Sequence, residues 1–244
     1  MARIFITGSA DGLGLMAAKL LVKEGHQVVL HARNSERGKH ALDNLPAAEK
    51  VLLAELSSID ETKRLADEVN ALGSFDAIIH NAGVYQASPN VIFRVNSLAP
   101  YILTCLIEKP KRLVYLSSGM HLQGDPTLKG LTGHTPGCSY SDSKLHDVIL
   151  SMAVSGKWPD VLSNSVNPGW VATKMGGAGA PDNLQEGSET QVWLAVSTDE
   201  KAKVSGRYFH HKKEDHYLPQ AAEAVVQEKF IDLCRAISGV DLKV

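Results

Sequence analysis

Several features that would place this 244-residue chain in a special class are missing from it. It has no apolar run near the roughly 20 residues that a membrane-spanning helix needs. The chain begins MARIFITGSA, where the apolar run is too short for the core of a signal peptide. The net charge of −2 provides no basic surface for nucleic acid or for an anionic membrane. We therefore expect neither a membrane span nor a nucleic-acid partner.

Cysteine is also scarce, with only Cys105, Cys138 and Cys234. An odd number of cysteines without a Cys-x-x-Cys motif argues for free thiols in a reducing cytoplasm. Cys138 lies two residues before Tyr140 and is a candidate for a reactive thiol, but an ordinary cysteine is the favoured interpretation. The remaining composition, 44% hydrophobic and 21% charged, is that of a globular protein.

Short runs rich in Val, Ile and Leu alternate with helical patterns along the whole chain. We expect strands at 3–7, 27–32, 50–55, 75–80, 112–117, 161–167 and 206–210, and helices at 12–24, 35–45, 58–71, 91–108, 140–156, 186–197 and 219–237. Continuous apolar strands that alternate with helices indicate right-handed crossovers and a parallel sheet covered on both faces. The pattern predicts a single α/β domain, residues 1–244, with a doubly wound, mostly parallel sheet of seven strands. We expect residues 1–110 to bind a cofactor and residues 111–244 to supply catalysis and substrate binding.

A glycine-rich segment, TGSADGLG, follows the first expected strand directly and opens the first helix. Glycine allows a tight turn and lets the backbone approach a ligand closely. The helix N-terminus then presents free N–H groups and a partial positive charge to a pyrophosphate. This position between a strand and a helix favours a dinucleotide site over a plain turn. The candidate contacts are Thr7, Gly8, Ser9, Asp11, Gly12, Leu13 and Gly14.

The spacing Thr-Gly-x-x-x-Gly-x-Gly resembles that of the short-chain dehydrogenase/reductase family. Three further segments resemble this family, namely AEL (54–56), HNAG (80–83) and NPGWVAT (167–173), and each follows an expected strand. In open α/β sheets, ligands bind beyond the carboxyl ends of the strands. The resemblance implies a Rossmann fold and a nicotinamide dinucleotide. It also implies cofactor contacts from Glu55, Leu56, Asn81, Ala82, Gly83, Pro168, Gly169, Val171 and Thr173.

The residues at the end of the second strand favour NADP(H) over NAD(H). An acidic residue about 20 positions after the glycine loop would bind the adenosine ribose, whereas an arginine accommodates the 2′-phosphate of NADP. Arg33 and Asn34 occupy this place, and a guanidinium can hold a phosphate through paired hydrogen bonds. Asp11, where NADP-preferring relatives often carry a basic residue, and Glu36, which could reach the ribose, argue for NAD. A surface salt bridge is the alternative role of Arg33.

The segment CSYSDSK places a tyrosine and a lysine four positions apart. On a helix, Tyr140 and Lys144 lie on one face. A lone Tyr-x-x-x-Lys is more often a solvated helix start, but here the motifs above precede it. The family's catalytic serine corresponds to Ser118, with Ser117 as the alternative, and its catalytic asparagine corresponds to Asn96. The resemblance implies a tetrad of Asn96, Ser118, Tyr140 and Lys144, in which Tyr140 and Lys144 also contact the cofactor.

The chemistry of carbonyl reduction explains these residue types. A free phenol has a pKa near 10, whereas general acid–base catalysis works best near the working pH. A shift of about three units requires roughly 4 kcal/mol of selective phenolate stabilisation. We expect the ammonium of Lys144 to make the Tyr140 hydroxyl more acidic, and Ser118 to donate a hydrogen bond to the substrate oxygen. The resemblance implies that Asn96 holds a water for a proton relay.

Two loops are expected to border the substrate. Ser118 and Tyr140 are 22 positions apart (140 − 118), farther than in most of the family, and the segment between them is rich in Gly, Pro and Thr. This spacing resembles that of retinol-dehydrogenase-like and protochlorophyllide-reductase-like members, which implies an apolar ketone or aldehyde. The second segment, KMGGAGAPDN (174–183), is either a mobile lid or a flexible surface loop. His121, Trp170 and Met175 are candidates for lining the pocket.

Two further features have ordinary interpretations. The segment HHKKEDH (210–216) is rich in possible metal ligands, but hydride chemistry needs no metal, and we expect a solvated, charged loop without a metal site. Relatives usually assemble as dimers or tetramers through the fourth and fifth helices, so a homodimer or homotetramer is expected. The apolar face of Tyr101, Leu103, Leu106 and Ile107 is compatible with such an interface and equally with core packing.

Three functions compete. The favoured one is an NADP(H)-dependent oxidoreductase of the carbonyl reductase or alcohol dehydrogenase type, and an NAD-dependent alcohol dehydrogenase is a variant of it. A regulator that senses NADP(H) without turnover is the second function, and the retention of both Tyr140 and Lys144 argues against it. A nucleotide-sugar epimerase fits poorly, because such enzymes have a different glycine spacing and a larger C-terminal part.

Overall fold

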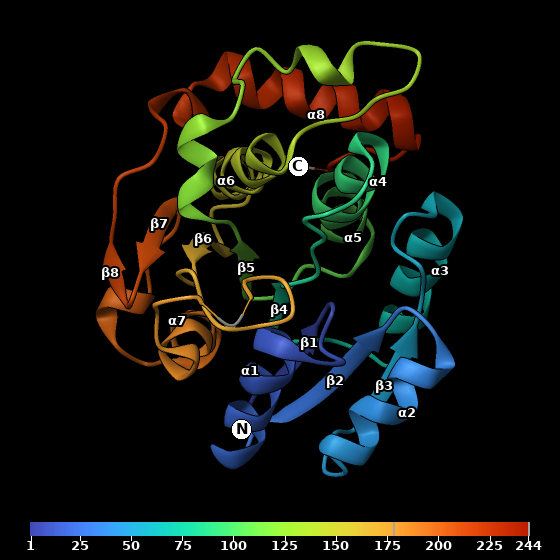
Figure 1. The fold of residues 1–244 in the computed structure, drawn as a ribbon, viewed down its shortest axis with the longest axis vertical. Helices are drawn as coiled ribbons and strands as arrows, with labels where there is room; N and C mark the ends of the chain where they lie inside the picture. The colour runs from blue at the N-terminus through green and yellow to red at the C-terminus, as the bar shows by residue number, and fades with distance from the viewer. Residues whose placement is uncertain (178, 244) are drawn as a thin grey trace.

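The fold is built on one continuous sheet of eight strands (Figure 1). The structure is a computed structural model that describes residues 1–177 and 179–243, so Val244, the end of the expected domain, lies outside the described residues. The strands are β1 (Arg3–Ile6), β2 (Gln27–Ala32), β3 (Lys50–Leu53), β4 (Ala77–His80), β5 (Arg112–Leu116), β6 (Leu162–Asn167), β7 (Arg207–His210) and β8 (Lys213–Glu214). Their order is β3-β2-β1-β4-β5-β6-β7-β8, and every pair is parallel except β7–β8. The order reverses between β1 and β4, which is where such sheets bind ligands.

The helices follow the strands in regular alternation. They are α1 (Gly12–Lys23), α2 (Ser35–Asn44), α3 (Ile59–Asn70), α4 (Pro89–Phe93), α5 (Ala99–Leu106), α6 (Tyr140–Lys157), α7 (Leu184–Val196) and α8 (Ala224–Ser238). The predicted ends of the strands and helices agree with these bounds to within a few residues in most cases. The α/β fold with a mostly parallel sheet is therefore confirmed.

The two faces of the sheet carry separate hydrophobic cores. Phe5 and Val29 point to one face, where α3, α5 and α6 cover them, and Ile4 and Leu30 point to the other face, beneath α1, α2 and α7. Successive residues of a strand point to opposite faces, so a strand covered on both sides is apolar throughout. This explains why β1 and β2 appear as continuous apolar runs in the sequence.

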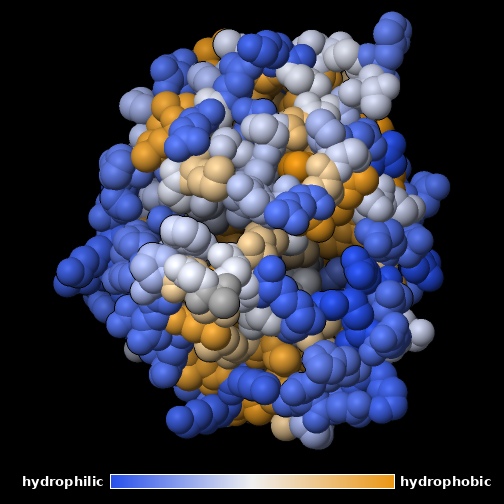
Figure 2. All heavy atoms as spheres, in the orientation of Figure 1, coloured by the Kyte–Doolittle hydropathy of each residue, from blue (hydrophilic) through white to orange (hydrophobic). Residues whose placement is uncertain are grey.

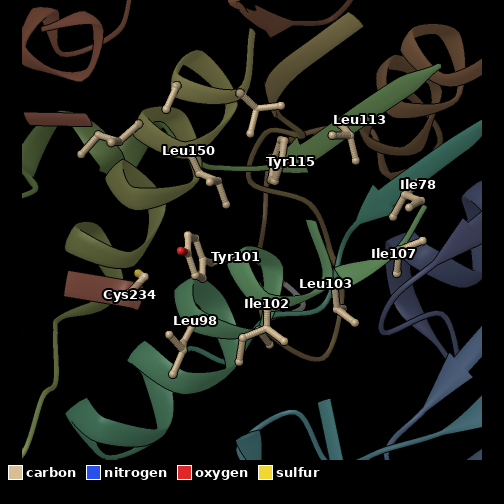
Figure 3. Close-up of a cluster of buried hydrophobic side chains, with 14 of the residues drawn as sticks. Ile78, Leu98, Tyr101, Ile102, Leu103, Ile107, Leu113, Tyr115, Leu150 and Cys234 are labelled. Carbon is tan, nitrogen blue, oxygen red and sulfur yellow. The ribbon is translucent and has the colours of Figure 1, made fainter. Parts of the chain in front are cut away.

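Helix α8 forms an additional layer over α6 and α5. Residues 143–154 of α6 are buried on all sides, because the sheet lies against one side and α8 against the other. Figure 3 shows Tyr101 of α5 between Leu150 of α6 and Cys234 of α8. The Tyr101 hydroxyl donates a hydrogen bond of 2.8 Å to the carbonyl of Val240. Of the apolar face proposed for an interface, Tyr101, Leu103 and Ile107 are thus buried within the chain, which leaves core packing as their role.

Three segments differ from the expected elements. The helix expected over 91–108 is two α-helices joined by a π-helical turn, Arg94–Leu98. The expected loop over 119–139 contains two short 3₁₀ helices, Gly119–Gln123 and Lys129–Leu131. The charged loop expected over 210–216 is a tight hairpin, because positive φ angles at His211 and Lys212 turn the chain back into β8. The sheet therefore has eight strands and not seven.

The exterior is mainly polar. On the face shown in Figure 2, blue hydrophilic residues prevail along the outline of the molecule, with smaller hydrophobic patches between them. Among the described residues, none of the helices combines the length and the apolar character that crossing a lipid bilayer requires.

Candidate active site

The glycine loop passes close to the end of β4, and this approach requires glycine. Gly8 has a φ of +62°, and a β-carbon there would lie 2.7 Å from the Cα of Ala82. At Gly14 a β-carbon would lie 2.4 Å from the side-chain nitrogen of Asn81. These contacts are shorter than packing allows, so larger residues would displace the loop from the strand ends. The backbone there can therefore lie against a ligand without a side chain between them.

The buried side chains of Thr7 and His31 and the half-buried side chain of Asn81 fix the loop in this shape. Asn81 donates to the carbonyls of Thr7 and Gly8, at 3.0 Å each. The Thr7 hydroxyl accepts from the backbone N–H groups of Asn81 and Ala82. His31 accepts from the Gly8 N–H at 2.9 Å, and its other ring nitrogen lies 3.0 Å from the Ala54 carbonyl. No motif of the sequence indicates this role of His31, because it depends on contacts with Gly8 and Ala54, more than 20 residues away in either direction.

Ser9 and Leu13 differ in how they could serve a cofactor. Ser9 is fully buried; its hydroxyl donates to Ile6 and accepts from the His31 N–H, and its own N–H donates to the His31 carbonyl, so both of its donors already have partners in the protein. Leu13 packs near Gly187, at 3.2 Å from where a β-carbon of that residue would lie. The two residues therefore shape the loop, and their side chains do not offer polar contacts to a cofactor.

The end of β2 carries a cluster of charges around Asp11. Arg33 is exposed there, and Asn34 caps α2 by accepting from the Arg37 N–H at 3.0 Å. Arg37 forms an ion pair of 2.7 Å with Asp11, and Lys174 approaches the same carboxylate at 3.2 Å. Partial burial opposes the charge of Asp11, but the two cations more than offset it and hold the pKa of Asp11 below its ordinary value. Within the described residues Arg33 enters no ion pair, so the salt bridge considered for it is absent.

The residues after β3 are oriented inward. The Glu55 carboxylate accepts from both the N–H and the hydroxyl of Ser57, at 3.0 Å each. Leu56 is 5% exposed and belongs to the core. Both bonds from Ser57 go to the same oxygen, Oε1, and the Glu55 N–H donates to Glu61, so among the described residues the second carboxylate oxygen of Glu55 is the group left for a contact to an adenine.

The segment after β6 lies opposite the glycine loop. Thr173 is the nearest neighbour of a β-carbon at Gly12, at 3.9 Å. Val171 is buried and forms a bridge with Asp182, whose carboxylate accepts from the backbone N–H of Trp170. Gly169 has a φ of +83°, which allows the chain to turn directly after Pro168. This arrangement brings the predicted nicotinamide-binding residues to the strand ends beside the glycine loop.

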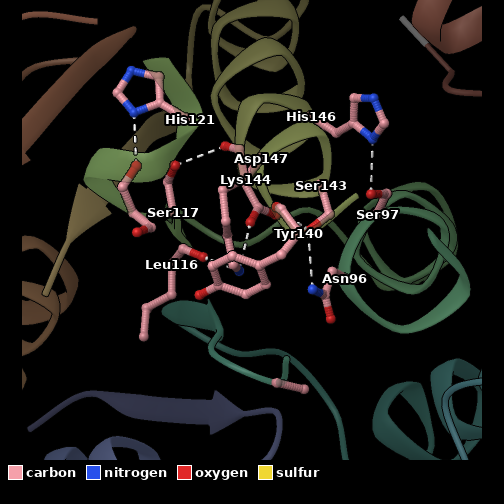
Figure 4. Close-up of polar contacts among 12 residues, drawn as sticks. Asn96, Ser97, Leu116, Ser117, His121, Tyr140, Ser143, Lys144, His146 and Asp147 are labelled. Carbon is pink, nitrogen blue, oxygen red and sulfur yellow. Dashed lines mark hydrogen bonds and ion pairs between the residues drawn. The ribbon is translucent and has the colours of Figure 1, made fainter. Parts of the chain in front are cut away.

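Tyr140 and Lys144 lie at the first turn of α6 (Figure 4). Ser139 and Asp142 form a capping box that fixes where this helix begins. The Lys144 nitrogen lies 5.6 Å from the centre of the Tyr140 ring. The ammonium is 4% exposed and donates to the Leu116 carbonyl at 2.7 Å and to the Asp147 carboxylate at 2.9 Å. The expected juxtaposition of the tyrosine and the lysine is thus present.

The two serines after β5 face different ways. Ser117 is buried, and its hydroxyl donates to the Lys144 carbonyl at 2.7 Å. Ser118 is half-buried, and its hydroxyl oxygen accepts from the Met120 N–H at 3.2 Å. Because Ser117 is occupied with α6, Ser118 is the better candidate for contact with a substrate. His121 is fully buried and bridges the carbonyl of Ser118 and the N–H of Leu218, so it does not line a pocket as expected.

Asn96 lies in the π-helical turn between α4 and α5. Its side chain exchanges two hydrogen bonds with the backbone of Val84 and donates a third to the Ser143 hydroxyl. A β-carbon at Gly83 would lie 3.6 Å from both the Asn96 oxygen and the Lys144 nitrogen. Single π-helical turns frequently occur at functional sites. The turn places Asn96 against Gly83, which also borders the Lys144 nitrogen, although the three residues are far apart in sequence.

The segment 174–183 extends over Tyr140, apart from Ala178, which lies outside the described residues. The sulfur of Met175 is 3.9 Å from the Tyr140 hydroxyl, and the Trp170 indole donates to the Gly176 carbonyl at 2.8 Å. Tyr85, which the sequence analysis missed, packs edge-on against Tyr140 with ring centres 4.8 Å apart. A thioether thus lies against the hydroxyl of Tyr140, and an aromatic ring packs against its own ring. A surface hollow of about 460 Å³ between α1 and α7 contains none of the predicted site residues.

The structure also bears on Cys138 as a reactive thiol and on segment 210–216 as a metal site. Burial raises the pKa of Cys138 to about 12, which disfavours a reactive thiol. His210 and His211 stack with ring centres 3.9 Å apart. Across the described residues, no group of three or more His, Cys, Asp or Glu side chains could hold a metal ion.

Comparisons with known proteins agree with this geometry. A family model described as short chain dehydrogenase matches residues 2–102. An uncharacterized oxidoreductase of Emericella nidulans is 45% identical over 98% of each chain. The chain belongs to the short-chain dehydrogenase/reductase family. The short-chain dehydrogenase chyC of Penicillium rubens is 43% identical over 99% of each chain.

More distant similarities bear on the branch of this family and on the fold. Retinol dehydrogenase 14 of Mus musculus is 26% identical over 97% of this chain and 86% of its own, which confirms the predicted resemblance to retinol-dehydrogenase-like members. A blue fluorescent protein from a metagenomic library, solved in complex with NADPH, has a TM-score of 0.72 at 16% identity. The similarity covers 86% of this chain and 95% of that one. The protein is therefore an oxidoreductase of a family that binds nicotinamide cofactors.

Proposed function

We propose that this protein is an NADP(H)-dependent oxidoreductase that interconverts a carbonyl and an alcohol, with Tyr140 as the general acid and base. The placement of the Tyr140 hydroxyl carries the proposal. Among the described residues its only polar contact is the Met175 thioether, a weak acceptor, while the Lys144 ammonium lies near its ring. A hydroxyl without a strong partner is available to a substrate oxygen. When bound, the nicotinamide would supply or accept the hydride.

The chain's own residues would handle the proton and the developing charge. Tyr140 would give its proton to the substrate oxygen during reduction and take it back during oxidation. The nearby ammonium of Lys144 would stabilise the phenolate that forms in between. Because Ser118 accepts from the Met120 N–H, its own O–H remains to donate to the substrate oxygen.

The loop geometry and the charges support NADP(H) as the cofactor. Gly8 and Gly14 leave the strand ends open to a pyrophosphate at the start of α1. Arg33 is exposed at the end of β2, and Arg37 lies one helical turn further. The guanidinium of Arg33 suits a 2′-phosphate better than the uncharged ribose of NAD, and Arg37, which is paired with Asp11, is a second cation near it. The NADPH bound to the structurally similar metagenomic protein agrees with this choice.

Replacing Arg33 with aspartate is expected to reverse the cofactor preference. A hydrogen bond to a charged group contributes about 2 kcal/mol, and the new carboxylate would also repel the phosphate. We expect the ratio of kcat/KM for NADPH to that for NADH to fall on the order of 100-fold. Lys39→Asp, the same charge change on α2 at an ion pair with Asp43, serves as the control and should leave the ratio unchanged. A wild-type protein that already prefers NADH would contradict the assignment.

The surroundings of Tyr140 support an apolar ketone or aldehyde as the substrate. The Met175 sulfur lies against its hydroxyl and Tyr85 packs against its ring, and the resemblance to retinol-dehydrogenase-like proteins agrees with an apolar substrate. The test is to mix the purified protein and NADPH with quinones, aldehydes and ketones and to follow the loss of NADPH absorbance. Binding of NADPH without any substrate-dependent loss across the panel would favour the regulatory sensor over the enzyme.

Two further expectations stay predictions. A cytoplasmic location rests on the three free cysteines. A homodimer or homotetramer would need a surface other than the face of α5 that α8 and the C-terminal segment bury. Analytical ultracentrifugation of the purified protein measures the oligomeric state directly.

A further inference from the structure

Lys144 has a buried carboxylate as its neighbour, one helical turn further along α6. Asp147 is 2% exposed and Lys144 is 4% exposed, and their charged atoms are 2.9 Å apart. Figure 4 shows the two side chains extending from α6 toward the ring of Tyr140. A carboxylate is expensive to bury, and one that only stabilises the fold would gain little in the interior. Its position behind the tyrosine and lysine therefore requires an explanation.

The contacts of Lys144 restrict what its ammonium can do. An ammonium has three protons, of which one goes to the Leu116 carbonyl and one to Asp147. One proton remains for a ligand or a water. Gly83 borders the same nitrogen, since a β-carbon there would lie 3.6 Å away. Asp147 and Leu116 thus fix both the position of the nitrogen and the number of protons that it can offer.

We propose that Asp147 is a positioning residue for the Tyr140–Lys144 pair, whose carboxylate holds the Lys144 ammonium in place and sets the pH range in which the pair works. This inference rests on the proposed role of Tyr140 as the general acid and base. A carboxylate beside the ammonium reduces the positive field at Tyr140 and at the same time keeps Lys144 protonated. Both effects move the titrations of the pair to higher pH.

The electrostatic environment agrees with this assignment. Burial opposes the charge of Lys144, but Asp147 more than offsets it and keeps the pKa of Lys144 above its ordinary value. Burial likewise raises the pKa of Asp147, to about 7, although the ammonium favours its ionised form. Tyr140 on α6, Tyr115 on β5 and Cys138 before α6 also interact electrostatically with the pair. Burial raises the pKa of Tyr115 and Cys138, so both are neutral in the working range.

The test removes the charge of Asp147 and keeps the shape of its side chain. In Asp147→Asn, the alkaline limb of the profile of kcat/KM against pH should move to lower pH by about one unit, whereas below about pH 7, where Asp147 is itself largely protonated, the two profiles should converge. A readout independent of turnover is the ¹³C NMR signal of labelled tyrosine in the protein without cofactor, assigned by its loss in Tyr140→Phe. The midpoint of the Tyr140 titration should also move to lower pH. Asp232→Asn, an exposed carboxylate paired with Arg235 on α8, is the control and should change neither.

The outcomes separate the two proposals. Profiles and midpoints of Asp147→Asn that superimpose on those of the wild type, or that move to higher pH, would overturn the role of Asp147. If the asparagine variant does not fold, Asp147→Ser removes the same charge with a smaller side chain and must give the same shift. If the wild type turns over no carbonyl or alcohol, the proposed function fails, while the NMR titration still decides whether Asp147 controls Tyr140.

Discussion

Replacing Tyr140 with phenylalanine is expected to reduce kcat by about 1,000-fold while NADPH binding stays nearly unchanged. The substitution removes one hydroxyl and keeps the ring, so the edge-on packing against Tyr85 is retained. The lost group is the one that would exchange a proton with the substrate. Turnover of a ketone and the fluorescence of bound NADPH, measured on the same preparation, check the two parts of this expectation.

Tyr85→Phe is the matched control for this experiment. It removes a hydroxyl from the neighbouring ring, which lies 4.8 Å away, and should leave kcat within a few-fold of the wild type. Near-full activity of Tyr140→Phe would remove Tyr140 from the mechanism. An equal loss in both variants would indicate that aromatic packing, and not the proton, is what matters at this position.

Acid is expected to destabilise the fold strongly between about pH 6.5 and pH 4, because buried histidines would have to take up protons. Burial lowers the pKa of His31 and His146 to about 4 and that of His80 to about 3. The unfolded chain binds these protons below about pH 6.5, so stability falls as the pH decreases through this window. Each histidine costs about 2 kcal/mol at pH 5. Protonation of Asp147, whose pKa burial raises to about 7, offsets part of this loss.

The free energy of unfolding in urea, measured at pH 7.5 and at pH 5, checks this expectation. A net loss of about 3 kcal/mol is a large part of the stability of a typical domain. His80→Phe keeps an aromatic ring stacked on Tyr115, and Thr104 still bonds to the Tyr115 hydroxyl. We expect this variant to lose about 2 kcal/mol less than the wild type between the two pH values. His134→Gln, at an exposed position, is the control, and equal losses in all three proteins would contradict the explanation.

Protonation of His31 at acidic pH should also destabilise the candidate site. Its ring accepts a hydrogen bond from the Gly8 N–H, and a doubly protonated imidazole cannot accept one. The glycine loop would therefore lose a support at acidic pH. This link between a buried histidine and the cofactor loop is visible only in the folded protein.

The sequence predicted the sheet well because its pattern is local. Apolar strands and the helices between them follow from runs of neighbouring residues, and the ends of β2 and α6 agree closely with those expected. The π-helical turn at Arg94–Leu98 and the two-residue strand β8 were missed. The first is a change of hydrogen-bond register within one helix, and the second depends on two positive φ angles in a charged segment, which propensity does not reveal.

Some residues of the candidate site could be recognised in the sequence, and others only in the folded structure. The glycine loop and the Tyr140–Lys144 pair are recognisable because one turn and one helix face fix their spacing, whereas Ser118 is recognised only by its place after β5. Arg37, Tyr85 and Asp147 were not recognised as site residues, because the role of each depends on the group that it faces. Arg37 faces Asp11, Tyr85 faces the ring of Tyr140, and Asp147 faces Lys144. Asp147 is only three residues from Lys144, yet no sequence pattern states that both side chains turn inward beneath α8.

The sequence by itself determined the kind of fold, and it singled out the glycine loop and the Tyr140–Lys144 pair as candidates for cofactor binding and acid–base catalysis, since these depend on short-range periodicity and spacing. The tertiary structure alone decided which charges meet across the strand ends, which serine faces outward and which face α8 covers. The physical reason is that these properties arise from burial and from contacts between segments far apart in the chain. Such contacts set the charge and the hydrogen-bonding freedom of each group, and so the chemistry that it can perform.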